Sequence, residues 1–181
     1  MIMNEQKRLE SIVKYIRGKT SLVPELAAVL GSGWGDCLDR IVVTTVLTFD
    51  ELPFFPKSTI PEHAGKMIFG KLHDIPIVVL QGRVHYYEGY EMYEVVRPVR
   101  VFKMLGVKTI VLTNAAGAIS PNYQIGDIVS ITNHISSFVP NPLRGVNLDM
   151  LGPRFPDMSE IYDVNLRNIA KAVGERANIE I

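Results

Sequence analysis

Short apolar runs, each ending in a glycine-rich or polar loop, constrain the fold of this chain most strongly. Three of them are "LAAVL" at 26–30, "IPIVVL" at 75–80 and "TIVL" at 109–112. Their apolar residues are nearly continuous rather than alternating, which is typical of strands buried on both faces of a sheet. Segments with helical periodicity lie between such runs. The sequence therefore predicts an α/β fold with a mixed, mainly parallel central sheet flanked by helices.

The other expected elements follow from periodicity and from helix-breaking residues. Apolar residues recur at helical spacing over 4–17, and Gly18 is the expected stop. Residues 91–107 also have a helical pattern, in which Pro98 should produce a kink or mark the first turn. Further strands are expected over 41–49, within 65–80 on both sides of a turn at His73 and Asp74, and over 125–135, with a final helix beginning near 162.

Composition narrows the class of ligand. The 181 residues suit a single domain spanning 1–181, and 19 basic residues balance 19 acidic ones. Without a net positive charge or a basic run, the chain has no electrostatic signature for nucleic acid or an acidic membrane. Cys37 is the sole cysteine, which excludes an intrachain disulfide and fits a reducing compartment. With no signal-peptide pattern and no apolar run of membrane-spanning length, we expect a cytoplasmic protein with a small-molecule ligand.

Polar residues gather in three loops that follow apolar runs. These loops are "GSGWG" at 31–35, "GRVHYYEGY" at 82–90 and "TNAAGAI" at 113–119. In open α/β sheets, ligands bind beyond the carboxyl ends of the strands. If the three strands are parallel, the three loops converge on one cleft.

The glycines of "GSGWG" allow a tight turn whose N–H groups point inward, and Ser32 adds a hydroxyl donor. This arrangement suits an anion, although a glycine-rich turn that only connects two elements fits the same letters. A dinucleotide site, and with it a nicotinamide-dependent oxidoreductase, fits poorly. The G-x-G-x-x-G pattern needs glycine where this chain has Asp36, and β-branched residues rather than a helix follow.

Arg83 and His85 lie two residues apart on an extended segment, so their side chains are expected on the same side. A guanidinium binds two oxygens of a phosphate and stays charged at physiological pH, so the pair is suited to hold one anion. The alternatives are a surface salt bridge between Arg83 and Glu88 and a structural role for His85. The three tyrosines of the same loop either pack as ordinary aromatics or provide a surface for a sugar.

Two other kinds of catalytic site have little support in the sequence. None of the four histidines lies in an H-x-x-x-H pair or beside a C-x-x-C motif, so no metal site is expected. The chain also lacks the G-x-S-x-G motif of an α/β-hydrolase nucleophile.

Seven segments together resemble the trimeric purine nucleoside phosphorylases. In chain order they are "VLGSGWG", "FPKSTIPEHAGK", "LQGRVHYYEGY", "VRVFKMLGVKTIVLTNAAGAI", "GDIVSITNHI", "NPLRGVN" and "GPRFPDMS". The resemblance extends from about residue 22 to residue 162, and "TNAAG" favours this family over the methylthioadenosine phosphorylases, which remain the alternative. It implies that inorganic phosphate displaces the purine from a nucleoside, without cofactor or metal, in a homotrimer.

The resemblance also implies roles for individual residues, including an aromatic side chain that reaches across a subunit boundary to cover the neighbour's nucleoside. The implied residues are Ser32, His63, Arg83, His85 and the N–H of Ala115 for phosphate, His85 and Asn114 for catalysis, and Tyr87 and Phe155 for the ribose and substrate.

The sequence departs from the family in two ways. Glu62 stands where the family commonly has glycine, and a carboxylate beside His63 repels phosphate unless it points away. Family members also continue past residue 181 with the residues that hold the purine. We therefore expect this chain to be an N-terminal portion with an uncovered apolar sheet edge and negligible phosphorolysis of its own, which also fits a non-catalytic phosphate- or nucleotide-binding fragment.

Overall fold

The computed structural model describes residues 4–31, 33–57 and 65–181. The chain divides into two compact units. The first comprises 1–115 and 141–152, and the second comprises 116–140 and 153–181. The expectation of one domain over the whole chain stays a prediction.

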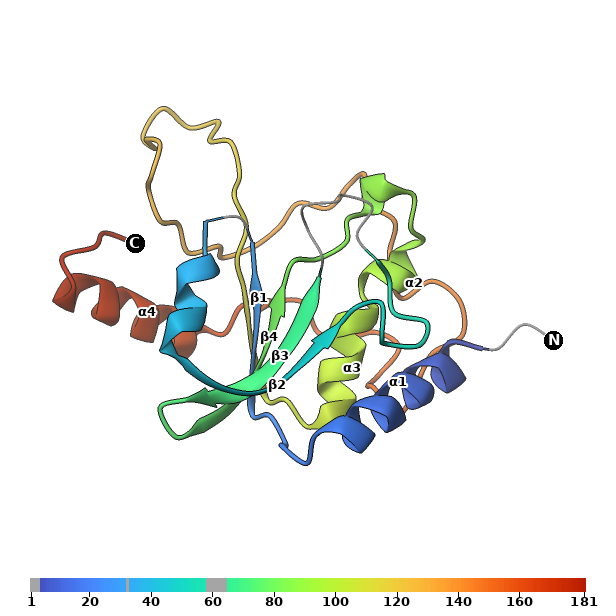
Figure 1. Cartoon of the computed structure of the whole chain (residues 1–181). Coiled ribbons are helices and arrows are strands. Elements are labelled where there is room, and N and C mark those ends of the chain that lie inside the picture. Colours follow the sequence, from blue (N-terminus) through green and yellow to red (C-terminus); the bar gives the residue numbers. More distant parts are fainter. Residues whose placement is uncertain (1–3, 32, 58–64) are drawn as a thin grey trace. The chain divides into compact units, whose positions relative to one another are not determined.

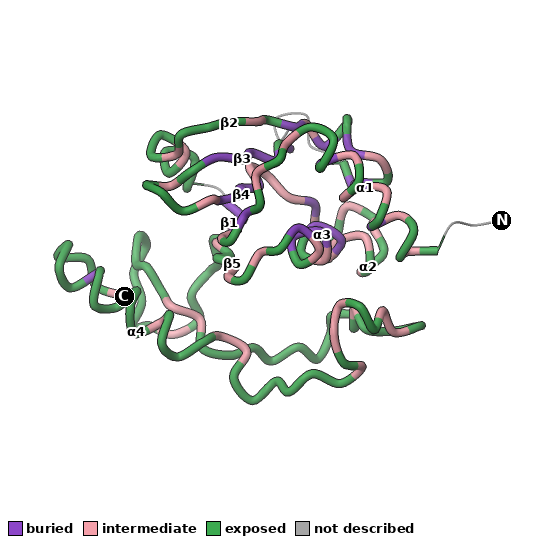
Figure 2. The backbone as a smooth tube through the Cα atoms, turned by 90° about the horizontal axis from the view of Figure 1, so that it is seen from below, coloured by how far each residue is buried: buried purple, intermediate pink, exposed green. Residues whose placement is uncertain are grey.

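The first unit is built on a five-stranded sheet with the order β2-β3-β4-β1-β5 (Figure 1; β5 is labelled in Figure 2). β1 pairs in parallel with β4 and with β5, whereas β3 is antiparallel to both β2 and β4. Of these five strands, only β3 therefore runs against the others, which confirms the predicted α/β fold with a mixed, mainly parallel sheet. The strands are β1 Leu26–Leu30, β2 Ile41–Thr48, β3 Lys66–Leu72, β4 Ile75–Gln81 and β5 Thr109–Leu112.

The two faces of the sheet bury different residues. On β4, Val78 and Leu80 belong to the larger core cluster, while Ile77 and Val79 belong to a smaller one, as the two-residue period of a strand requires. Helices α1 (Glu5–Lys19) and α3 (Arg97–Leu105) lie side by side and contribute their apolar faces to the larger cluster (Figure 1). The smaller cluster is packed by Leu38 of the 3₁₀ helix η1 (Gly35–Arg40).

Local sequence signals set most helix ends. The side chain of Asn4 accepts the N–H of Lys7 and caps α1. The prediction that this helix stops at Gly18 is wrong, because α1 continues to Lys19 and the N–H of Thr20 still donates to the Ile16 carbonyl at 3.0 Å. Pro98 marks the first turn of α3, as expected, after the short helix α2 (Met92–Val95).

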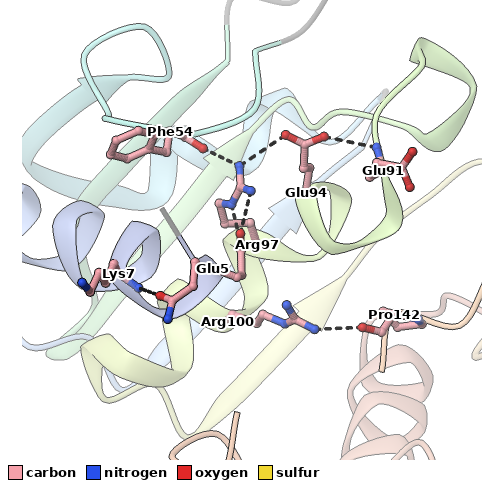
Figure 3. A network of polar contacts seen from close by, with 9 residues as sticks. Glu5, Lys7, Phe54, Glu91, Glu94, Arg97, Arg100 and Pro142 are labelled. Carbon is pink, nitrogen blue, oxygen red and sulfur yellow. Dashed lines mark hydrogen bonds and ion pairs between the residues drawn. The ribbon is translucent and has the colours of Figure 1, made fainter. Parts of the chain in front are cut away.

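A buried cation joins the start of α3 to α1 and to the loop after β2. The guanidinium of Arg97 donates to both carboxylate oxygens of Glu5, at 2.8 and 2.9 Å, and to the carbonyl of Phe54 (Figure 3). A carboxylate oxygen of Glu94 lies 3.7 Å from the same guanidinium. Only 1% of Arg97 is exposed, so these acceptors compensate a charge that has been removed from water.

The second unit contains one helix among its described residues, α4 (Val164–Arg176). The carboxylate of Asp163 accepts the N–H of Leu166 and caps it. The predicted strand over 125–135 is wrong, because these residues form no strand. β-Branched residues favour an extended backbone, but a strand forms only where a neighbouring strand accepts its hydrogen bonds. Most residues of this unit are exposed (Figure 2).

No helix of the described residues combines the length and the apolar character that a membrane crossing requires.

Candidate active site

The sheet places the starting points of the three polar loops side by side. β1 lies between β4 and β5, with Leu30 opposite Gln81 and Val29 opposite Leu112. Because the three strands are parallel, their carboxyl ends share one edge of the sheet. The loops are also connected directly, since Thr113 hydrogen bonds to both Gly31 and Arg83. The starts of the three loops therefore meet at this edge as predicted, while a cleft between them stays a prediction.

The side chains of Arg83 and His85 hydrogen bond to each other in the loop after β4. The Nε–H of Arg83 donates to Nε2 of His85 at 3.3 Å, and its Nη1 donates to the carbonyl oxygen of Thr113 at 2.5 Å. Arg83 is half-buried, so solvent screens its charge less than that of an exposed arginine. A guanidinium held in this way keeps further N–H groups for an oxyanion.

The orientation of His85 is set by a carboxylate. One oxygen of Glu88 accepts both the backbone N–H of His85 at 2.7 Å and the ring Nδ1–H at 3.0 Å. Only 2% of the Glu88 side chain is exposed. Since the guanidinium of Arg83 can only donate, Nε2 of His85 must accept, which leaves the ring proton on Nδ1 toward Glu88. His85 thus has the structural role weighed in the sequence and also faces the arginine.

The tyrosines of this loop have different environments. The ring of Tyr87 stacks on that of His85, with centroids 4.8 Å apart and an interplanar angle of 12°. It remains 74% exposed, so its outer surface is available to a ligand. The hydroxyl of Tyr90 instead hydrogen bonds to the backbone N–H and carbonyl of Lys57, which is a structural contact.

The loop after β5 begins with Thr113 and continues with the predicted site residues Asn114 and Ala115. Asn114 and Ala115 are exposed, and the amide of Asn114 donates to the carbonyl of Ala115 at 3.3 Å. The hydroxyl of Thr113 accepts the N–H of Gly31 at 2.8 Å. Gly31 fits here because a Cβ at this position would lie 2.9 Å from the Thr113 carbonyl oxygen. Glycine is therefore needed at position 31 because the two backbones approach closely, and not because an open turn requires its conformational freedom.

The described residues of the first unit do not include three of the predicted site residues. Ser32 and His63 are outside the described residues, as is Glu62. Phe155 belongs to the second unit, where its side chain is 86% exposed. The roles of these residues stay predictions.

The described part of the site combines one fixed cation with an oriented imidazole and a buried carboxylate. The carboxylate of Glu88 hydrogen bonds to His85, and the guanidinium of Arg83 offers a positive charge to an anion. Within residues 4–31, 33–57 and 65–181, no three His, Cys, Asp or Glu side chains are placed to hold a metal ion. The arrangement is chemically suited to an oxyanion such as phosphate.

Sequence reasoning did not assign the functions of Glu88 and Thr113. A glutamate three residues after the start of a tight turn is a capping signal, and that spacing identifies Glu88 as a partner of His85. Thr113 offers a weaker signal. A threonine directly after a strand can continue the hydrogen-bond ladder with its hydroxyl, but the sequence does not show which strand is its neighbour.

The chain also matches a known family of proteins. Residues 25–181 match the family described as the Phosphorylase superfamily, and the chain belongs to it.

Within that family, the chain is similar to purine nucleoside phosphorylases. It is 41% identical to that of Bos taurus over 94% of this chain and 62% of the relative, and 40% identical to purine nucleoside phosphorylase 1 of Geobacillus stearothermophilus over 96% and 63%. The crystal structure of a Schistosoma purine nucleoside phosphorylase in complex with hypoxanthine superposes with a TM-score of 0.87 at 36% identity, over 98% of this chain and 63% of that one. The chain thus spans under two thirds of the length of these proteins.

Proposed function

We propose that the protein carrying this sequence catalyses the phosphorolysis of purine ribonucleosides and deoxyribonucleosides. The products are the free purine base and (deoxy)ribose 1-phosphate. The observation that carries the proposal is the Arg83–His85 pair, held at the carboxyl ends of β4, β1 and β5 by hydrogen bonds to Glu88 and Thr113. Family membership and the names of the relatives support it. Those names do not favour a methylthioadenosine phosphorylase.

The chemistry that this pair suits is phosphate-driven glycosidic cleavage. As the bond to the base breaks, the sugar gains oxocarbenium character, which a neighbouring phosphate anion stabilises. A rigid arginine fixes that phosphate, and a fixed nucleophile reacts faster than one that must diffuse and orient. Phosphate forms the new bond to the anomeric carbon, and the purine leaves with the electron pair of the old one. The purine gains one proton, which balances the proton that monohydrogen phosphate loses as it becomes the phosphate ester. This proposal requires neither a metal nor an organic cofactor.

The proposed roles follow the resemblance residue by residue, with a homotrimer in the cytoplasm as the proposed assembly and location. Tyr87, stacked on His85 with an exposed outer face, supports the ribose assignment. The complete proposed set is Ser32, His63, Arg83, His85 and the N–H of Ala115 for phosphate, His85 and Asn114 for catalysis, and Tyr87 and Phe155 for the ribose and substrate, with Phe155 acting across a subunit boundary.

Calorimetric titration of the 181-residue chain with inorganic phosphate tests the site. We expect Arg83→Ala to weaken binding about 10- to 100-fold, because a hydrogen-bonded charge is lost. Arg40→Ala removes an exposed arginine from η1 and should leave the affinity unchanged. Equal affinities of the wild type and the Arg83→Ala variant would contradict the assignment, provided that circular dichroism shows both chains folded.

Inosine turnover tests the reaction separately. A protein that carries this sequence and extends to the length of the relatives should release hypoxanthine only when phosphate is present. Release in water alone, or none at all, would contradict the phosphorylase proposal. The relatives extend well beyond the matched region, so we expect the 181-residue chain to bind phosphate with negligible turnover. Rapid phosphate-dependent release by that chain would refute only this last expectation.

A further inference from the structure

Thr113 makes four hydrogen bonds at the point where β5 ends. Its backbone N–H and its hydroxyl both donate to the carbonyl oxygen of Val29, each at 3.1 Å. The same hydroxyl accepts the N–H of Gly31 at 2.8 Å, and the Thr113 carbonyl accepts Nη1 of Arg83 at 2.5 Å. One residue therefore connects β1, the turn after it and the arginine of the loop after β4.

The hydroxyl extends the hydrogen bonding between β1 and β5 past the last residue pair of their ladder, Val29 with Leu112. The N–H of Gly31 donates to this hydroxyl rather than to a backbone carbonyl of β5. A hydroxyl has one proton and two lone pairs, so it can donate to Val29 and accept from Gly31 at the same time. A valine at position 113 would fill nearly the same volume but would leave the N–H of Gly31 without this acceptor.

The same contact fixes the carbonyl that holds Arg83. A Cβ at Gly31 would lie 2.9 Å from the Thr113 carbonyl oxygen, so the two backbones are in direct contact. Displacement of the turn after β1 must therefore move this carbonyl. Because that oxygen accepts a hydrogen bond from the guanidinium, its position affects the direction in which Arg83 points.

We propose that Thr113 is a positioning residue for the phosphate site, in addition to the roles proposed above. Its hydroxyl fixes the turn at Gly31 and, through the shared backbone contact, the orientation of Arg83. Thr113 contacts no reacting atom in this proposal and acts through those two residues. The inference rests on the proposed function, because its effect is measured as phosphate affinity.

Calorimetric titration of the full 181-residue chain with inorganic phosphate tests this role. We expect Thr113→Val to weaken binding about tenfold, equivalent to about 1.4 kcal/mol, because the guanidinium loses its orientation. Thr113→Ser keeps the hydroxyl and should bind within about twofold of the wild type. Thr109→Val is the matched control at the other end of β5, where the backbone N–H rather than the hydroxyl hydrogen bonds to Glu25.

Hydrogen exchange of the Gly31 amide gives a second readout that needs no variant. If the hydrogen-bonded turn is the form that binds phosphate, phosphate must in return stabilise that turn, because the two equilibria are linked. Saturating phosphate should therefore slow exchange at Gly31 in the wild type. Unchanged exchange on binding would overturn the proposal even if Thr113→Val failed to fold.

The outcomes separate the two proposals. If the wild type does not bind phosphate, the proposed phosphate site is wrong and Thr113 has nothing to position. If the wild type and a folded Thr113→Val variant bind phosphate equally while Arg83→Ala does not bind, only the role of Thr113 is wrong. Loss of binding in Thr113→Val together with retention in Thr113→Ser supports both.

Discussion

Phe69 and Phe138 show the difference between the two units of this chain. Phe69, on β3 of the first unit, is completely buried, whereas 98% of Phe138 in the second unit is exposed. The buried core clusters consist of residues of the first unit, and Gly174 is the one buried residue that α4 has. Burial of apolar surface is the main favourable contribution to folding, so the first unit has a stabilisation that the second lacks.

The units also differ in which elements form without burial. α4 is helical although it is largely exposed, because its hydrogen bonds lie within the segment and Asp163 caps its start. Residues 125–135 have the composition of a strand and form none. A helix satisfies its own backbone, while a strand depends on a neighbour. Three comparisons between matched variants test this contrast between the units, and a fourth tests the effect of burial within the first unit.

The largest expected effect comes from truncating one phenylalanine in each unit. Phe69→Ala should lower the free energy of unfolding by about 3–5 kcal/mol, because it leaves a cavity in the core. Phe138→Ala should change it by less than about 0.5 kcal/mol, because the side chain is already in water. Urea unfolding of the full chain measures both, with the fluorescence of its single tryptophan, Trp34, reporting on the first unit and far-UV circular dichroism, to which α4 contributes, reporting on the second. Equal effects would break the contrast between the units.

A smaller effect is expected from the buried ion pair of the first unit. Glu5→Ala removes the bidentate partner of Arg97 and leaves a buried charge with fewer acceptors (Figure 3). We expect a loss of about 3 kcal/mol in the free energy of unfolding.

The control for this pair is Glu25→Ala, which removes the partner of Lys108. This second pair is exposed, with 75% of the Lys108 side chain and 53% of the Glu25 side chain in solvent. It should cost less than about 1 kcal/mol. The same urea titration compares the two variants. Similar losses in the free energy of unfolding would show that burial is not the reason why the Arg97 pair stabilises the protein.

The helix caps provide the third comparison, since α1 and α4 each have a side-chain acceptor at the start. Asn4→Ala should lower the free energy of unfolding by about 1 kcal/mol, because α1 packs into the core. Asp163→Ala removes an equivalent cap but should only fray α4, leaving the Trp34 transition unmoved. Amide hydrogen exchange along α4 measures that fraying. A shift of the Trp34 transition in Asp163→Ala would instead couple the stabilities of the two units.

The smallest expected effect concerns two exposed carboxylates. Hydrogen bonds from the N–H and hydroxyl of Thr48 lower the pKa of Glu51 from its ordinary value of 4.5, and those from the hydroxyl and N–H of Ser159 lower the pKa of Asp157 from 3.8. A lowered folded pKa means stability that is present above the unfolded pKa and lost as pH falls through the folded value.

Glu51→Gln should therefore reduce the thermal midpoint slightly at neutral pH, and the difference should vanish as the pH falls below the lowered pKa of Glu51. Asp157→Asn should leave the Trp34 transition unchanged at every pH, because Asp157 belongs to the second unit. Thermal melts between pH 3 and pH 7 make the comparison. A pH-independent difference for Glu51→Gln would show that its hydrogen bonds, not its charge, are responsible.

Much of the first unit was predictable from the sequence. "LAAVL" forms β1 over the residues expected. Residues 65–80 form two strands, with His73 between them in the left-handed region at φ 53°. Pro98 lies in the first turn of α3. Each of these depends on signals within a few residues, namely apolar runs, a turn and a residue without an N–H. The side-by-side placement of Arg83 and His85 was also local, since it follows from their spacing.

The contacts that make the site rigid were not predictable in this way. The sequence by itself determined most strands and helices of the first unit, and which polar residues follow the strands, because those choices depend on neighbouring residues. Only the tertiary structure decided that β1 lies between β4 and β5, that Thr113 meets Gly31 and Arg83, and that residues 125–135 form no strand. The physical reason is that a hydrogen bond between distant segments needs both partners in place, and chain order does not specify which segments become neighbours.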